Sequence, residues 1–252
     1  MPFLGDILAA SQRLNPRNLC RIRMNSNGLI KAYFLPGMAT DQRLYSKMTI
    51  KGVEPVFIDW PPHQECKSLH DYAQLLAERF IQSAEPHVLV GSSMGGMVAV
   101  ELSHITHPLH TYLLSAPATR REFPRLLNRV RASRVHKILG PKTVFQINRL
   151  ADVFMGFKTA QDRAVFYEML AENGPDFLHF AVNAVLEWDG QVAPAAYTQM
   201  LGSEDKLFPP HCAEAIPQVI DGGGHFTTFE FPQELSERLN RAFSELRLPL
   251  RP

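Results

Sequence analysis

The chain has 252 residues, of which 45% are hydrophobic and 20% are charged. This length and composition suit one large globular domain with a substantial core, and they exclude a disordered chain. The 26 basic and 25 acidic side chains leave a formal net charge of +1, so no overall field favours nucleic acid or an anionic membrane, and we expect a small-molecule partner.

Strands and helices alternate along the first 117 residues. Apolar runs that end at turn signals predict strands, and apolar residues three or four positions apart predict helices. Such alternation is typical of a mainly parallel sheet with helices on both faces. The predicted strands cover residues 19–24, 29–35, 53–58, 87–91 and 109–115, and the clearest predicted helices cover 68–80 and 94–104.

The segment His87–Leu102 contains the motif Gly91-Ser92-Ser93-Met94-Gly95 between a buried strand and a helix. A turn this abrupt requires a sparsely populated backbone conformation at its middle residue, and a Cβ at either glycine would collide with the neighbouring strand or helix. Ser93 would then stand clear of the sheet as a nucleophile, beside the N–H of Met94. The alternative is a tight strand-to-helix turn without chemistry.

The loop after the strand 29–35 is the predicted second half of an oxyanion hole. In a sheet enzyme with a serine nucleophile, this early loop supplies one backbone N–H. Pro36 has no N–H, so the donor should be Met38, with Gly37 allowing close approach. A simple Pro-Gly turn is the alternative.

Asp59 follows the strand 53–58, at the edge of the sheet where sites gather in α/β proteins. Because it precedes the nucleophile in the chain, we expect it to hydrogen-bond a loop and not to take part in the reaction.

Helical patterns replace the alternation between residues 118 and 195. We expect this segment to form a helical cap over a core made of residues 1–117 and 196–252. Residues 120–137 carry seven basic side chains and one acid, Glu122. A solvated helix face accounts for this stretch, and attraction of an anionic substrate, such as the thioester of a phosphorylated carrier, is the alternative.

Two late loops supply a base and an acid. Strands are predicted at 196–202 and 216–220, and His225 follows the second strand after three glycines. Asp205 follows the first strand. A serine nucleophile needs a base within hydrogen-bond reach and a carboxylate that orients this base, so we predict Ser93, Asp205 and His225 as a catalytic triad. Glu204 and Asp189 are the competing acids.

The three cysteines, Cys20, Cys66 and Cys212, lie far apart and lack metal-ligand spacing. We expect no metal and no cofactor. The N-terminus shows no secretory signal pattern, and no apolar run approaches the roughly 18 residues of a membrane span. These features favour a cytoplasmic protein.

The chain resembles the α/β-hydrolase superfamily with a helical cap, from about residue 29 to 247. The matching motifs are Gly91-Ser92-Ser93-Met94-Gly95-Gly96, Gly202-Ser203-Glu204-Asp205 followed by Pro209, and Gly223-Gly224-His225-Phe226. The resemblance implies an eight-stranded, mostly parallel sheet and the same triad. One departure is that the usual His-Gly of the oxyanion loop is Pro36-Gly37, which removes a side chain that often steadies this loop.

The expected function is cleavage of a carboxylic ester with a small or medium apolar group, through an acyl-enzyme. Thioesterase, amidase and carbon-carbon bond hydrolase activities use similar machinery and stay open, as does a ligand-binding or receptor module with little turnover. The apolar residues expected to line the substrate pocket are Trp60, Phe154, Trp188 and Phe226.

Overall fold

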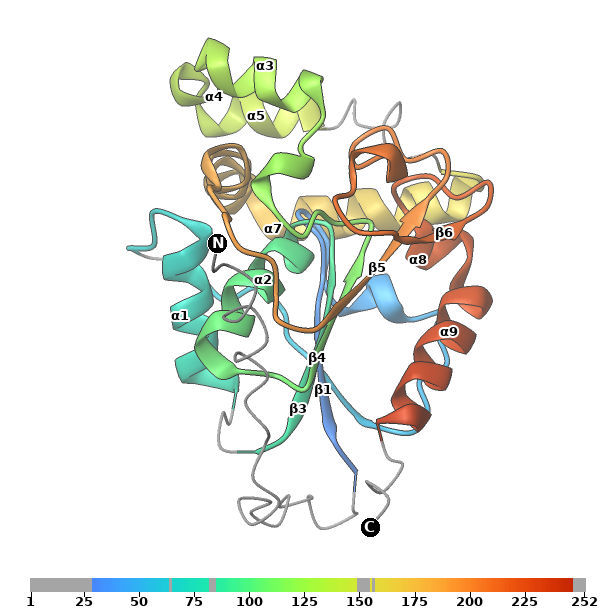
Figure 1. The fold of residues 1–252 in the computed structure, drawn as a ribbon. Helices are drawn as coiled ribbons and strands as arrows, with labels where there is room; N and C mark the ends of the chain where they lie inside the picture. The colour runs from blue at the N-terminus through green and yellow to red at the C-terminus, as the bar shows by residue number, and fades with distance from the viewer. Residues whose placement is uncertain (1–28, 64, 82–84, 149–154, 156, 247–252) are drawn as a thin grey trace, which may run out of the picture.

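The computed structural model describes residues 29–63, 65–81, 85–148, 155 and 157–246 (Figure 1). Within these residues a single parallel sheet has the strand order β2-β1-β3-β4-β5-β6. Each strand coincides with a predicted apolar run. The strands are β1 (Lys31–Leu35), β2 (Glu54–Phe57), β3 (His87–Ser92), β4 (His110–Leu114), β5 (Tyr197–Gly202) and β6 (Gln218–Ile220).

The expectation of an eight-stranded sheet is wrong for the described residues, where the sheet has six strands. The number eight came from the resemblance, whereas the sequence between 29 and 246 contains only six runs with a strand pattern. The further strand predicted at 19–24 lies outside the described residues. The fold class itself is confirmed, with helices on both faces of a parallel sheet.

The sheet is buried on both faces, which explains its continuous apolar runs. Alternate residues of one strand enter different core clusters: Tyr33 and Leu35 join one cluster, and Ala32 and Phe34 join the other. Helices α1 (Leu69–Phe80) and α2 (Met94–Thr106) cover the first face. Helix α9 (Pro232–Glu245) covers the second (Figure 1).

The described part of the chain between β4 and β5 is mainly helical and lies above the carboxyl ends of the strands (Figure 1). The longest helix, α7, runs across this edge in two helical parts that meet at Gly174, where φ is 75°. The elements of this insertion are η3 (Arg120–Glu122), α3 (Arg125–Ser133), α4 (Val135–Ile138), α5 (Pro141–Asn148) and α7 (Ala160–Glu187).

Short helices fill the remaining connections. These are η2 (Gln42–Tyr45), η4 (Pro210–Cys212) and α8 (Thr227–Glu230). None of the helices in the described ranges has both the length and the apolar character that a membrane crossing requires.

Candidate active site

Ser93 sits at the abrupt turn between β3 and α2, with φ 52° and ψ −119°. A Cβ on Gly95 would lie 2.2 Å from the carbonyl oxygen of Pro36, and one on Gly91 would lie 2.3 Å from that of Gly95. A side chain on Gly95 would therefore push the end of β1 away from helix α2, and one on Gly91 would push β3 away from the same helix. The predicted requirement for glycine at both positions is confirmed. Ser93, at the turn between them, is part-exposed at the end of β3.

Two late loops meet beside this serine because glycines let their backbones touch. A Cβ on Gly202 would lie 2.2 Å from the carbonyl oxygen of Gly223, and the Glu204 N–H donates to that same oxygen at 2.8 Å. The chain following β5 is thereby joined to the chain following β6. Asp205 and His225, which lie in these two loops, are brought side by side.

The three polar side chains form one hydrogen-bonded line. Nε2 of His225 lies 2.9 Å from Oγ of Ser93, and its Nδ1 lies 2.9 Å from Oδ2 of Asp205. A carboxylate can only accept, so Nδ1 carries the proton that is donated to Asp205. In the neutral imidazole ring, Nε2 is then the acceptor for the Ser93 hydroxyl.

Asp205 is buried, with 2% of its surface exposed. Burial alone would raise the pKa of this carboxyl, but the charge and hydrogen bond of His225 and the N–H groups of Phe208 and Leu207 together outweigh it. The pKa of Asp205 therefore lies below its ordinary value. The two N–H groups donate to Oδ1 at 2.9 and 2.8 Å, which leaves Oδ2 for the imidazole.

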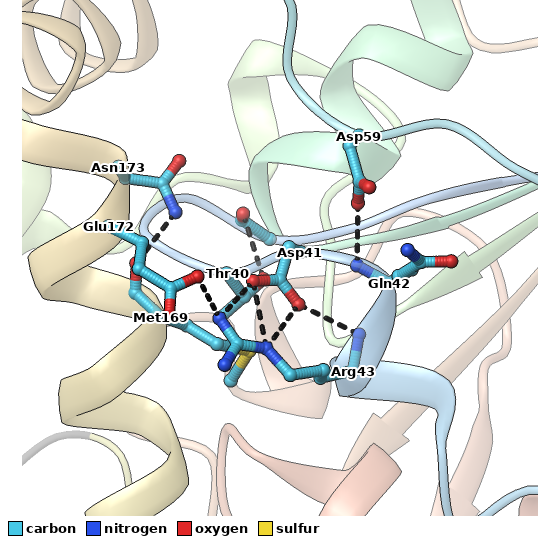
Figure 2. A network of polar contacts seen from close by, with 9 residues as sticks. Thr40, Asp41, Gln42, Arg43, Asp59, Met169, Glu172 and Asn173 are labelled. Atoms are coloured by element: carbon cyan, nitrogen blue, oxygen red, sulfur yellow. Dashed lines mark hydrogen bonds and ion pairs between the residues drawn. The ribbon is translucent and has the colours of Figure 1, made fainter.

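The competing acids are not in this line. Glu204 and Asp189 are both exposed, and Glu204 takes part in the loop contact through its backbone. Asp59 accepts the backbone N–H of Gln42 at 2.8 Å, the loop-holding role expected of it (Figure 2).

A pocket with about 390 Å³ of empty space, part of it open to solvent, lies over Ser93 and His225. Most of its walls are apolar. Phe226 lines this pocket, and so does Met38, the predicted oxyanion donor. The other lining residues are Gly37, Thr40, Leu44, Ser92, Met155, Phe166 and Leu207.

Two of the four predicted pocket residues, Trp60 and Trp188, are not among these walls. Trp60 lines a separate hollow with Asp59 and Phe177, and its indole N–H turns to the Gly37 carbonyl. Trp188 is buried, and its indole N–H donates to Glu101. Their side chains are directed by contacts distant in sequence, which an apolar residue type alone does not reveal. Phe154 lies outside the described residues.

The backbone places both predicted oxyanion donors near the serine. Met94 is the first residue of α2, where N–H groups have no partner within the helix. Met38 lines the same pocket as Ser93, and its neighbour Gly37 is close to the serine, since a Cβ on Gly37 would lie 3.5 Å from Cβ of Ser93. Within the described ranges, no three His, Cys, Asp or Glu side chains gather as a metal site would require.

The basic stretch 120–137 is partly neutralised by its surroundings. Arg121 pairs with Glu214 at 2.7 Å, and Lys137 pairs with Glu187 at 3.2 Å. The guanidinium of Arg120 lies 4.1 Å from the ring centre of Phe123. These contacts give several of the cations structural partners, and attraction of an anionic substrate stays a prediction.

Solved structures with this fold include several hydrolases. An esterase from Thermogutta terrifontis is 17% identical, with a TM-score of 0.66 over 87% of this chain and 91% of that one. The N-acyl homoserine lactonase AidH is 14% identical, with a TM-score of 0.64 over 88% of this chain and 92% of that one. The type II thioesterase YbtT of a yersiniabactin pathway is 17% identical, with a TM-score of 0.58 over 88% and 96%.

No curated protein sequence matches the chain. The model of the alpha/beta hydrolase family matches residues 33–238, which is most of the chain and includes all six strands except the first two residues of β1. Together with the parallel sheet and its helical insertion, this match shows that the chain belongs to the alpha/beta hydrolase family.

Proposed function

We propose that this hydrolase cleaves a carboxylic ester of a small or medium apolar substrate through an acyl-enzyme on Ser93. The observation that supports the proposal is the line from Ser93 to His225 to Asp205, with both hydrogen bonds at 2.9 Å, under an apolar pocket. A serine hydroxyl is a weak nucleophile at neutral pH, and an oriented imidazole is what activates it.

In acylation, Oγ of Ser93 attacks the ester carbonyl carbon while Nε2 of His225 takes the hydroxyl proton. The carbonyl oxygen becomes an oxyanion, which the N–H groups of Met38 and Met94 would stabilise, each by about 10²-fold to 10³-fold in rate. The imidazolium, stabilised by Asp205, then protonates the leaving alkoxide. The alcohol departs and the acyl group stays on Ser93.

In deacylation, a water molecule loses its proton to His225 and attacks the acyl carbonyl. A second oxyanion forms at the same position and collapses, and Ser93 regains its proton from the imidazolium as the carboxylic acid leaves. The site thus returns to its starting protonation state after one ester bond and one water are consumed.

The apolar walls of the pocket support the proposed substrate class. Met38, Leu44 and Phe226 from the core face Met155 and Phe166 from the insertion. Transfer of an apolar acyl or alcohol group from water to such walls lowers its free energy. The contribution of both parts supports residues 118–195 acting as a cap over a core of 1–117 and 196–252.

The proposal is tested first by Ser93→Ala. We expect turnover of p-nitrophenyl butanoate to fall by more than about 10⁴-fold, because the nucleophile is lost. Labelling by a fluorophosphonate should vanish with it. Ser103→Ala, a serine of the same helix whose hydroxyl donates to the Val100 carbonyl away from the pocket, should keep both activities.

Two outcomes would contradict the proposal. Persistent labelling of Ser93→Ala on Ser92 would show a different nucleophile. A stoichiometric burst of p-nitrophenol with negligible further turnover in the wild-type chain would instead favour a receptor that binds its ligand covalently. A panel of matched esters, thioesters, lactones and amides of one acyl group then identifies the bond that is cleaved fastest.

A further inference from the structure

One backbone carbonyl beside Ser93 receives three hydrogen bonds. The oxygen of Gly37 accepts from Nε1 of Trp60 at 3.0 Å, from Oγ1 of Thr40 at 2.9 Å and from the Thr40 backbone N–H at 3.2 Å. A carbonyl has two lone pairs, so this acceptor is more than fully used. Its direction is fixed from three sides.

The direction of this carbonyl also fixes the direction of the Met38 N–H. Gly37 C=O and Met38 N–H belong to the same planar peptide unit, and the described chain contains no cis peptide bond. In a trans unit the two groups point in opposite directions. Donors that hold the Gly37 oxygen on one side therefore aim the Met38 N–H to the other side, and both Met38 and Ser93 line the pocket.

The turn that carries this peptide is strained and needs such support. Ala39 has φ 64°, a left-handed conformation that is costly for a residue with a Cβ, in the turn closed by the Thr40 N–H and the Gly37 carbonyl. Strain of this kind persists only where the surroundings impose it. The side chains of Thr40 and Trp60 are the two further donors that impose it here.

Trp60 lies in the loop that follows β2 and packs against aromatic rings of α1 and α7. Its ring lies 5.7 Å from that of Tyr72 and 6.1 Å from that of Phe177, measured between centroids. The neighbouring Asp59 accepts the N–H of Gln42 (Figure 2). Together with the bond from Trp60 to Gly37, this contact braces the Gly37–Gln42 segment at both ends.

We propose that Trp60 and Thr40 are positioning residues that aim the Met38 N–H at the developing oxyanion. They take the place of the side chain that is missing where Pro36 stands. This assignment rests on the proposed function, because it concerns the same reaction. Trp60 does not line the pocket, Thr40 does, and both side chains act through the Gly37–Met38 peptide.

Trp60→Phe removes the indole donor and keeps an aromatic ring against Tyr72 and Phe177. With p-nitrophenyl butanoate we expect kcat to fall about tenfold with KM unchanged, less than the 10²-fold to 10³-fold loss of a donor itself. Inhibition by a boronic acid, whose tetrahedral adduct places an oxygen at the oxyanion position, should weaken by the same factor. A merely structural role would not link these two readouts.

Trp188→Phe is the matched control, because it also removes an indole donor from a packed ring. Its lost partner is Glu101, on helix α2 and outside the pocket, at 2.7 Å. We expect kcat and boronic acid inhibition to stay within about twofold of wild type. An equal fall of kcat in both variants would assign the effect to general loosening and overturn the proposal.

Thr40 gives a second, independent variant. Thr40→Val removes the hydroxyl donor with little change in shape and should lower kcat severalfold at constant KM. Thr40→Ser, which restores the hydroxyl, should recover most of the lost rate. The proposal is overturned if Ser93→Ala is inactive while Trp60→Phe and Thr40→Val both keep wild-type kcat. If Ser93→Ala turns over like wild type, the proposed function fails and this assignment fails with it.

Discussion

Two carboxyl groups close to His225 have opposite electrostatic surroundings. The pKa of Asp205 is lowered, because the imidazole and two backbone N–H groups stabilise its charge against burial. The pKa of Glu230 is raised, first by burial and then by the nearby charges of Glu204 and Asp205, against the Gly224 N–H and Lys158. Only one oxygen of Glu230 has a partner, since Oε1 is buried without a hydrogen bond among the described residues.

The raised pKa of Glu230 has a consequence for stability. The folded state binds the proton of the Glu230 carboxyl more tightly than the unfolded state does. The stabilisation that this proton gives to the fold is fully present below the ordinary glutamate pKa of 4.5, and it is lost as pH rises through the raised pKa. At neutral pH the ionised carboxylate therefore destabilises the fold. We expect Glu230→Gln to raise the free energy of unfolding at pH 7, while its amide oxygen keeps the Gly224 N–H bonded.

Urea unfolding at a series of pH values checks this sign. The gain from Glu230→Gln should shrink as the pH is lowered toward the ordinary glutamate value, where the wild-type carboxyl is also neutral. Glu237→Gln, at an exposed position of α9, should change stability by less than about 0.5 kcal/mol throughout. A destabilising effect of Glu230→Gln at pH 7 would mean that its charge is needed by the His225 loop.

At the scale of elements, the turn between β3 and α2 depends on the close approach of three backbones. A Cβ at Gly95 would meet the carbonyl oxygens of Pro36 and Leu35 at 2.2 and 2.4 Å, and backbone cannot rotate away as a side chain can. Gly95→Ala should therefore displace the oxyanion loop relative to Ser93. We expect a loss of about 1–3 kcal/mol in the free energy of unfolding together with a fall in kcat.

Gly140→Ala is the control for this substitution. No atom lies within 4 Å of the Cβ that it would add, so thermal unfolding and turnover should stay near wild type. Normal stability and activity of Gly95→Ala would show that the end of β1 can yield without moving the site.

The elements and loops that position the site were predictable because their causes are local. Glycine spacing fixes the turn at Ser93, and apolar runs fix the strands to within a few residues. The capping box at the start of α1 has a local cause as well: the Ser68 hydroxyl accepts the Asp71 N–H, and the Asp71 carboxylate accepts the Ser68 N–H. Steric contacts and hydrogen bonds of this kind depend on residues that are close in sequence, so the sequence alone predicts them.

The pocket walls were not predictable in the same way. The sequence marks Trp60 and Trp188 only by residue type, but the direction of each indole is set by partners far along the chain, Gly37 and Glu101. Phe166 reaches the pocket only because α7 crosses the carboxyl edge of the sheet. In the sequence, Phe166 is only one apolar residue of a helical pattern. Such a pattern does not indicate which part of the core the helix covers.

At the scale of the whole molecule, the pocket lies between the core and the insertion, and ion pairs hold the two together. Arg43 joins Asp41 of the core to Glu172 of α7, at 2.6 and 2.5 Å (Figure 2). Lys47 pairs with Asp162 near the start of the same helix. Both pairs connect the segment after the oxyanion loop with the first half of α7, so the wall that α7 gives the pocket is fixed relative to Ser93.

That wall should set the length of acyl chain that the enzyme accepts. The cavity volume is only about 50 Å³, well below the roughly 300–1,000 Å³ typical of ligand sites, so p-nitrophenyl butanoate should be cleaved faster than the octanoate. Phe166, whose ring lies 5.7 Å from that of Phe226, closes the pocket from α7. Phe166→Leu should therefore raise the octanoate-to-butanoate ratio of kcat/KM about tenfold, since the added methylenes find room.

Phe180→Leu makes the same change in the other half of α7, away from the pocket, and should leave the ratio unaltered. Equal ratios in both variants and the wild type would mean that α7 does not limit the acyl group, and that the chain enters from another side.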